Sequence, residues 1–219
     1  MPVIFDVGAN DGNTCFHLCR DPRNTVYAFE PTPKLLDRLN FLKSLVSNYH
    51  VVPVAVSDTC GTAQFNIVTG DEWSSPNGET GGGGCSSLCS ISDNEKLKTA
   101  ETIDVQVITL EKFLEENDIK EVDFLHCDVQ GKDLEVLMGL GKHANRVKKG
   151  CIEMPRCLST RLYSNQVYDA ADAVRWLHEN GFLVDTIESN DEHVNEVNIS
   201  FHRIDKDDLK SVPFKPLII

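Results

Sequence analysis

Four acidic side chains stand at or near the ends of apolar, strand-like runs. They are Asp6, Glu30, Asp128 and Glu153. A carboxylate can stabilise a cationic ligand, accept the protons of sugar hydroxyls, take the proton of a reacting hydroxyl or bind a divalent cation. Open α/β sheets bind their ligands outside the carboxyl ends of the strands, so these four positions predict a site at that edge of a sheet.

Small and polar residues follow the first of these acids. The segment VIFDVGANDGNT passes from a strand over residues 3–7 into Gly8, Ala9, Asn10 and Gly12. A turn of this kind lets backbone N–H groups approach a nucleotide-like ligand at the start of the next helix. The dinucleotide fingerprint G-x-G-x-x-G would need glycine where Asn10 stands. The turn therefore departs from the pattern of a dinucleotide site.

Polar residues also follow the second and third strand-like runs. Glu30 ends the second run about 20 residues after the glycine turn, where an acidic side chain can accept both ribose hydroxyl protons. Pro31 and Pro33 fix the turn behind it, which argues against a merely solvent-facing role. Ser57 and Asp58 follow the third run, where Asp58 either hydrogen-bonds an adenine or belongs to a plain Ser-Asp turn.

Strand-like and helix-like segments alternate along the chain, which predicts one α/β domain with a mostly parallel central sheet. The expected strands are 3–7, 25–29, 50–56, 63–68, 103–108, 122–127 and 147–153, and the expected helices are 13–19, 34–46, 110–116, 133–140 and 166–180. Segments 182–187 and 197–201 predict an antiparallel C-terminal hairpin. We expect a single domain over residues 1–219, with residues 69–101 forming a mobile loop or lid.

The balance of acidic and basic residues indicates which kinds of ligand or partner the protein can bind. The chain has 219 residues and a formal net charge of −13, from 34 acidic and 21 basic side chains. This balance argues against a broad nucleic-acid or anionic-membrane surface and favours a small neutral or cationic ligand. No apolar run approaches the roughly 20 residues that span a bilayer. We expect a cytoplasmic protein without a nucleic-acid or membrane partner.

The eight cysteines predict free thiols rather than a disulfide framework. They contain no C-x-x-C, and several lie inside apolar runs where cysteine acts as a small hydrophobe. The spacing of Cys15 and Cys19, and of Cys85 and Cys89, is not followed by a second pair of ligands at zinc-site spacing. This usage fits a reducing compartment.

Five ordered blocks resemble the FkbM-type methyltransferase family. They are Asp6-x-Gly8-Ala9-Asn10-x-Gly12, residues 26–33 (VYAFEPTP), residues 54–61 (VAVSDTCG), Ser86-Ser87-Leu88 and residues 122–131 (VDFLHCDVQG). The resemblance implies a class I, Rossmann-like fold that binds S-adenosyl-L-methionine. It also implies transfer of a methyl group to a hydroxyl of a saccharide or other small molecule.

The resemblance implies which part of S-adenosylmethionine each residue of these blocks contacts. S-adenosylmethionine has no pyrophosphate, so Asn10 is acceptable in the turn while Gly8 lets the backbone come close. Its ammonium and sulfonium are cationic, and Asp6 can favour both. The resemblance likewise puts Glu30 on the ribose and brings Ser87 of the fourth block to the cofactor site. Ala9, Gly12, Pro31, Ser57, Asp58 and Asp128 complete the expected cofactor-binding set.

The fourth parallel strand is expected to carry the chemistry. Asp128 lies at its carboxyl end, where it can orient or deprotonate the acceptor hydroxyl, or bind Mg²⁺ together with Glu153. His126 shares the face of Asp128, roughly 6 to 7 Å further in, and is a second catalytic candidate. The family more often has lysine at His126 and glutamate at Gln130. The structural alternatives are a helix-capping Asp128 and a hydrogen-bonded core histidine.

Two other functions are weighed against an enzyme of this family. A short-chain dehydrogenase needs Tyr-x-x-x-Lys, and no tyrosine of this chain has lysine four residues later. A non-catalytic S-adenosylmethionine-binding module would keep the glycine turn and lose the acids of the fourth strand, whereas Asp128 and Glu153 are present. The acceptor is not readable from 69–101 or 155–166. The apolar segment 212–219 predicts packing on its own domain or on a second copy, as in a homo-oligomer.

Overall fold

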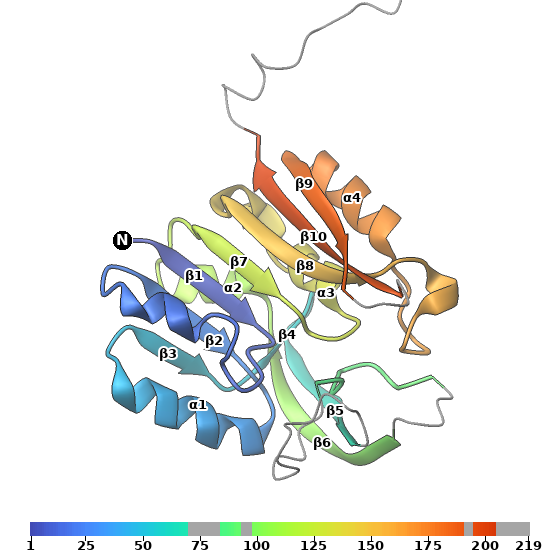
Figure 1. The fold of residues 1–219 in the computed structure, drawn as a ribbon, viewed down its shortest axis with the longest axis horizontal. Helices are drawn as coiled ribbons and strands as arrows, with labels where there is room; N and C mark the ends of the chain where they lie inside the picture. Colours follow the sequence, from blue (N-terminus) through green and yellow to red (C-terminus); the bar gives the residue numbers. More distant parts are fainter. Residues whose placement is uncertain (70–83, 93–97, 191–194, 205–219) are drawn as a thin grey trace, which may run out of the picture.

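The computed structural model describes residues 1–69, 84–92, 98–190 and 195–204. Its centre is a seven-stranded sheet in the order β3-β2-β1-β7-β8-β10-β9 (Figure 1). The strands are β1 (Val3–Val7), β2 (Thr25–Phe29), β3 (Tyr49–Val52), β7 (Phe124–Cys127), β8 (Lys149–Pro155), β9 (Phe182–Ser189) and β10 (Glu196–Arg203). The first five in chain order pair in parallel, and β10 runs antiparallel to β8 and β9. The predicted mostly parallel sheet with an antiparallel C-terminal hairpin is confirmed.

A second, three-stranded sheet was not predicted. It contains β4 (Ala55–Val56), β5 (Gly61–Thr69) and β6 (Lys98–Ile108) in the order β4-β6-β5. The prediction of one strand over 50–56 is wrong, because the chain leaves the central sheet after Val52 and joins the small sheet at Ala55. Pro53 lies between the two, and proline has no N–H to donate to a strand ladder.

The small sheet contains both ends of the segment 69–101, which the sequence predicted to be a mobile loop or lid. Thr69 ends β5, and residues 98–101 begin β6, so both ends of the expected loop are paired strand. Residues 84–92 lie against the rest of the fold, with Ser87 bridging Asn66 and Ile91 bridging Tyr163. Segments 70–83 and 93–97 lie outside the described residues.

The described residues contain four α-helices and three short 3-10 helices. They are α1 (Pro33–Leu45), α2 (Leu110–Glu116), α3 (Asp133–Met138), α4 (Ala170–Glu179), η1 (Phe16–Arg20), η2 (Gly141–Arg146) and η3 (Leu158–Thr160). The helix expected over 13–19 is the 3-10 helix η1. The helix expected from 166 starts at Ala170, because Asp169 and Asp172 form a capping box there.

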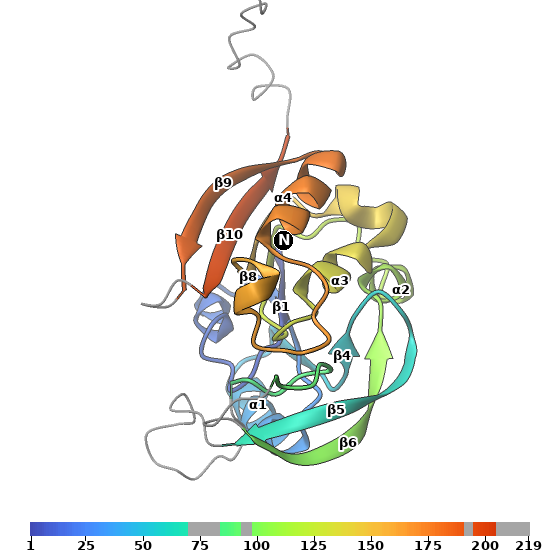
Figure 2. The same ribbon diagram turned by 90° about the vertical axis from the view of Figure 1, so that its right-hand side faces the viewer.

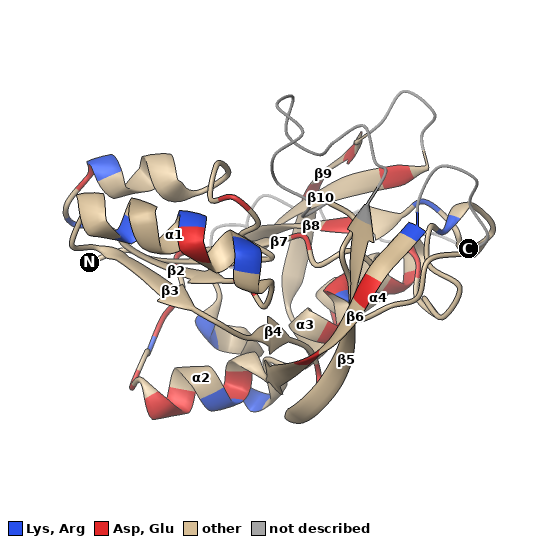
Figure 3. Ribbon diagram, turned by 90° about the horizontal axis from the view of Figure 1, so that it is seen from below, with Lys and Arg blue, Asp and Glu red and all other residues tan. Residues whose placement is uncertain are grey.

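The helices cover the two faces of the sheet unequally. Phe5, Leu125 and Ile152 pack in one core cluster with residues of α2, α3 and α4. Figure 2 shows these three helices on one face of the central sheet. Residues of the alternate register, such as Ile4 and Val26, pack with α1 and η1 on the other face, and Figure 3 shows α1 and α2 on opposite sides. No helix in the described ranges is long and apolar enough to cross a membrane.

Candidate functional site

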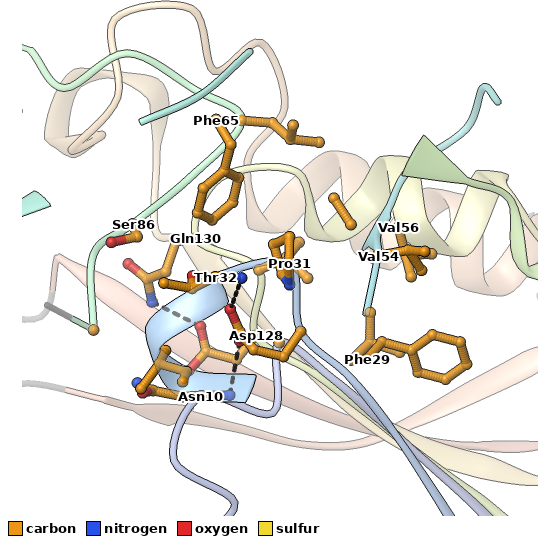
Figure 4. Close-up of a pocket in the computed structure, with 18 of the residues that line it drawn as sticks. Asn10, Phe29, Pro31, Thr32, Val54, Val56, Phe65, Ser86, Asp128 and Gln130 are labelled. Carbon is orange, nitrogen blue, oxygen red and sulfur yellow. Dashed lines mark hydrogen bonds between the residues drawn. The ribbon is translucent and has the colours of Figure 1, made fainter. Parts of the chain in front are cut away.

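A cleft opens at the carboxyl ends of β1, β2 and β7, where the sequence predicts the site. Gly8, Asn10, Asp11 and Thr14 of the turn after β1 form one part of its lining. Figure 4 shows Asn10, Thr32, Asp128 and Gln130 with the hydrogen bonds that hold this region together. The three strand ends and the turn therefore build the site.

Gly8 lets the turn lie against the end of β7. Its φ is +82°, and a Cβ at this position would stand 1.9 Å from the carbonyl oxygen of Asp128. The N–H groups of Gly8 and Ala9 both donate to the carbonyl of Phe29, at 3.1 and 3.0 Å, which ties the turn to β2 as well. Only glycine fits both the backbone conformation and the space.

Glu30 is held from two sides by backbone N–H groups. Its Oε2 accepts from Asn10 N at 2.9 Å, and its Oε1 accepts from Thr32 N at 2.8 Å. The residue is 5% exposed and lines the cleft. Burial raises the pKa of Glu30, and the bonds from Thr32 and Asn10 oppose that rise. The carboxylate is thus fixed in position with lone pairs remaining for a ligand.

An apolar wall faces this polar part of the cleft. Its side chains come from β2, α1, the small sheet, the link before β4 and the segment 84–92, and they are Phe29, Leu35, Val54, Val56, Phe65 and Leu88. Such a surface suits the flat face of a base. The sequence did not predict this wall, because Val56 and Phe65 reach the cleft only through the unpredicted sheet β4-β6-β5.

Charge distinguishes this cleft from a phosphate site. Asp11, Glu30 and Asp128 line it, and His126 is the only basic type of side chain among the described lining residues. Pyrophosphate sites use backbone N–H groups at a helix N-terminus, and many phosphate sites add lysine or arginine. Three carboxylates without a lysine or arginine instead favour a cationic ligand.

Asp6 contacts His126 and does not line the cleft. The two residues are register partners on β1 and β7, and Asp6 Oδ1 lies 3.0 Å from His126 Nδ1. Asp6 is fully buried, and its carboxylate, the Cys15 thiol and the His126 ring lie within 4.8 Å of one another. Burial disfavours a charged ring, but the hydrogen bond and the charge of Asp6 outweigh burial and raise the pKa of His126.

This pair predicts a pH-dependent contribution to stability. The pKa of His126 is raised on folding, so its contribution is complete below the unfolded value of about 6.5 and is lost as pH rises through the folded value. We expect wild type to lose stability relative to His126→Gln as the pH is raised from 6 to 9. Denaturant unfolding of both proteins across this range measures the difference. A difference that is constant with pH would contradict the ion pair.

Gln130 connects the two acids expected at the catalytic edge. Its Nε2 donates to Asp128 Oδ1 and to Glu153 Oε2, both at 2.7 Å, and its Oε1 accepts from the Tyr163 hydroxyl at 2.9 Å. Gln130 has a φ of +60°, which aims its side chain back between the strand ends. Glu153 does not line the cleft, and burial and the charge of Asp128 raise its pKa well above the usual range.

The structural alternative for Asp128 was a cap on the turn before α3. In the structure another residue, Asp133, has that role. Asp133 Oδ1 accepts from Val129 N at 2.9 Å, and its Oδ2 accepts from Gly131 N at 3.1 Å. Asp133 therefore holds the turn between β7 and α3, and burial together with the charge of Asp128 raises its pKa to about 8. The Asp128 side chain lines the cleft.

The described geometry does not suit Mg²⁺ between Asp128 and Glu153. The Gln130 amide occupies the place between the two carboxylates where a shared cation would bind. Among the described residues, the groups of three ligand types within 4.8 Å are Asp6, Cys15 and His126, and Glu111, Glu115 and His143. The predicted Mg²⁺ site at Asp128 and Glu153 gains no support.

Several residues expected at the cofactor do not line the cleft. They are Asp6, Ala9, Gly12, Ser57, Asp58 and Ser87. Gly12 instead lies against α1, where a Cβ would meet Leu42 at 2.6 Å, and Asp58 is exposed. Ser87 is buried, and its hydroxyl donates to the carbonyl of Gln130, so its neighbours Ser86 and Leu88 face the cleft in its place.

Comparison with known proteins gives this site a family. The methyltransferase FkbM domain model matches residues 6–184. A curated relative, the 2-O-methyltransferase NoeI of Sinorhizobium fredii (strain NBRC 101917 / NGR234), is 26% identical over 143 residues. That match covers 63% of this chain, and the chain spans 57% of the length of NoeI.

A solved structure shows the same fold at a greater distance. Aeropyrum pernix fibrillarin, crystallised with natively bound S-adenosyl-L-methionine, superposes with a TM-score of 0.51 and 10% identity. The superposition covers 91% of this chain and 65% of that one, and the sheet is that of a class I methyltransferase. Because the FkbM model spans most of the chain, from the glycine turn to β9, the chain belongs to the FkbM methyltransferase domain family.

Proposed function

We propose that this chain is an S-adenosylmethionine-dependent methyltransferase that methylates a hydroxyl of a saccharide or other small molecule. The observation that carries the proposal is the charge of the cleft, which has three carboxylates and no lysine or arginine among its described lining residues. S-adenosylmethionine carries a sulfonium and an ammonium and has no phosphate. An NAD-type ligand would place a pyrophosphate against these acids.

The cleft residues fit the separate parts of that ligand. Glu30, fixed by two backbone N–H groups, is proposed to accept the ribose hydroxyls, and Pro31 stands beside it. Val54, Val56 and Phe65 offer an apolar surface for the adenine. The turn at Gly8 and Asn10 is proposed to contact the amino-acid end of the ligand.

Asp128 is proposed as the residue that contacts the acceptor hydroxyl. S-adenosylmethionine supplies a methyl group on a cationic sulfur, and transfer needs an aligned oxygen that loses its proton. Asp128 lines the cleft beside Gly8, and Gln130 holds one of its oxygens at 2.7 Å. Glu153 is proposed to position Gln130, because it contacts the amide and not the cleft.

His126 is the second candidate base. Asp6 is positioned to hold its Nδ1, so Nε2 is the ring nitrogen left to accept a proton. A base at His126 must be neutral, so it would give a turnover that rises with pH through a pKa above 6.5.

Hydroxyl methylation rests on the similarity to NoeI, whose name describes a 2-O-methyltransferase. The alternative is a non-catalytic module that binds S-adenosylmethionine through the same cleft. Asp128 in the cleft lining favours the enzyme. Transfer of a labelled methyl group from S-adenosylmethionine to a panel of saccharides would support the enzyme. Binding of the donor without transfer to any acceptor would favour the module.

Removing the Glu30 carboxylate tests the cofactor site. We expect Glu30→Ala to weaken S-adenosylhomocysteine binding by about 10- to 100-fold, the range for losing hydrogen bonds to a charged group. Isothermal titration calorimetry measures this, and a thermal melt verifies folding. Asp58→Ala is the control, since this exposed acid does not line the cleft and its loss should leave affinity unchanged. Equal affinity of Glu30→Ala and wild type would remove Glu30 from the site.

A further inference from the structure

A second cleft lies on the face of the central sheet opposite α2, α3 and α4. Its floor is made of alternate residues from four strands, namely Ile4 of β1, Phe124 and His126 of β7, Cys151 of β8 and His202 of β10. Residues of the η1 segment form one wall. The helix α1 packs on the other half of this face, against β2 and β3, and does not line the cleft. We call it the sheet-face cleft.

The sheet-face cleft adjoins the proposed methyl-donor cleft. Thr14 and His126 line both. Its volume of about 1160 Å³ exceeds the roughly 300–1,000 Å³ typical of ligand pockets, so it has room for an extended molecule. A molecule in this cleft would therefore have one end at His126, next to the residues proposed to bind the methyl donor.

The charge of the sheet-face cleft is opposite to that of the chain. Its lining includes five basic side chains, Lys120, Arg146, Lys148, Lys149 and Arg203, against two acidic ones, Glu121 and Asp123. The whole chain has a formal net charge of −13. An excess of positive charge in one cleft of an acidic protein indicates an anionic ligand for that cleft.

The ion pairs and hydrogen bonds of these basic side chains show which of them are available to a ligand. Lys148 is paired with Glu121 and with Asp123, at 2.5 and 2.7 Å, which satisfies both acids of the lining. Lys120 is paired with Asp118, whereas Arg146 and Arg203 donate to the carbonyls of Ile119 and Val147, which are uncharged partners. Lys149 is exposed, and no carboxylate of the described residues lies within 4.0 Å of it.

Lys149 and His126 lie close enough for one ligand to contact both. His126 is the register partner of Cys151, and Lys149 precedes Cys151 by two residues on the same face of β8. Strands lie about 4.8 Å apart and two residues rise about 6.7 Å, so the two Cα atoms are about 8 Å apart. His202 is the register partner of Lys149 and lines the same region.

From this arrangement we infer that the methyl acceptor is an anionic hydroxyl compound that binds in the sheet-face cleft. Lys149, with Arg146 and Arg203, holds its phosphate or carboxylate group, and its reacting hydroxyl extends past His126 into the donor cleft, which Asp128 lines. The inference rests on the proposed function, and it assigns that function a substrate class. The overall acidity of the chain predicted a neutral or cationic ligand, which describes the donor cleft and not this one.

Anion titrations of the full chain saturated with S-adenosylhomocysteine test the inference. The probes are inorganic pyrophosphate, glucose 1-phosphate, glucuronate and glucose, at constant ionic strength, followed by amide NMR. We expect the phosphate or the carboxylate probes to shift the amides of residues 149–151 and 202–203, and to bind at least tenfold more tightly than glucose. Which of the two binds more tightly identifies the anionic group.

Charge reversal of one lysine provides the matched control. Lys149→Glu should weaken the binding of the preferred probe by roughly tenfold or more, since it removes a charged donor. Lys112→Glu makes the same change on α2, on the opposite face, and should alter affinity less than twofold. Equal binding of glucose and glucose 1-phosphate, or an unchanged affinity in Lys149→Glu, would overturn the inference. Retained S-adenosylhomocysteine binding in that case leaves the proposed function standing.

Discussion

Asp128→Asn is expected to lower methyl transfer by about 10² to 10⁴-fold while cofactor affinity stays near the wild-type value. This is the range for loss of a positioned general base. Asn keeps the size of the side chain and can still bond with Gln130, but it does not accept a proton near neutral pH. The fold should survive, because Asp133 and not Asp128 holds the turn before α3.

The measurement is turnover with an acceptor that the wild type methylates, together with calorimetry for S-adenosylhomocysteine. Asp58→Asn, at an exposed acid, is the matched control and should leave turnover unchanged. Addition of EDTA should have no effect on wild type, because the Gln130 amide stands between Asp128 and Glu153. Wild-type turnover in Asp128→Asn would remove this residue from the chemistry, and inhibition by EDTA would restore the metal hypothesis.

Gly8→Ala is expected to destabilise the fold by about 2 to 5 kcal/mol and to weaken cofactor binding. A left-handed backbone costs a residue with a Cβ about 1 to 2 kcal/mol, and overpacking adds about 1 to 3 kcal/mol. The overpacking here is against backbone, since the new Cβ would stand 1.9 Å from the Asp128 carbonyl oxygen. The turn and the end of β7 must therefore separate, and both line the cleft.

Gly181→Ala separates the cost of the left-handed backbone conformation from the cost of the contact with the Asp128 carbonyl. Gly181 has the same φ of +82°, but nothing lies within 4 Å of its Cβ position. We expect it to cost about 1 to 2 kcal/mol and to leave S-adenosylhomocysteine binding unchanged. Denaturant unfolding and calorimetry measure both quantities. Equal losses of stability in the two variants would show that the contact with Asp128 is unimportant.

The sequence predicted the central sheet because its strands are apolar and are separated by well-marked helices and turns. Glu30 and Asp128 were predicted at the correct edge for the same reason. The small sheet was missed because Val52 and Ala55 belong to one apolar run, and the change of sheet depends on tertiary pairing. Side chains such as Phe65 reach the cleft only through that sheet.

Two further differences between the sequence prediction and the structure come from contacts between segments that are distant in sequence. Asp6 meets His126 because β1 and β7 are neighbours in register, and strand order is not readable from one chain. Ser87 of the fourth block was expected at the cofactor, but in the structure its side chain bonds Gln130, and its neighbour Ser86 lines the cleft. A shift of one residue in an extended segment reverses the face of every side chain.

A crystal structure with S-adenosylhomocysteine tests the central claim most directly. The account predicts the ribose hydroxyls on the Glu30 carboxylate, the adenine against Val54, Val56 and Phe65, and the sulfur toward Asp128. Glu30 needs no rearrangement for this, since Asn10 and Thr32 already hold it. A ligand bound elsewhere, or a cleft that takes NAD and not S-adenosylhomocysteine, would contradict it.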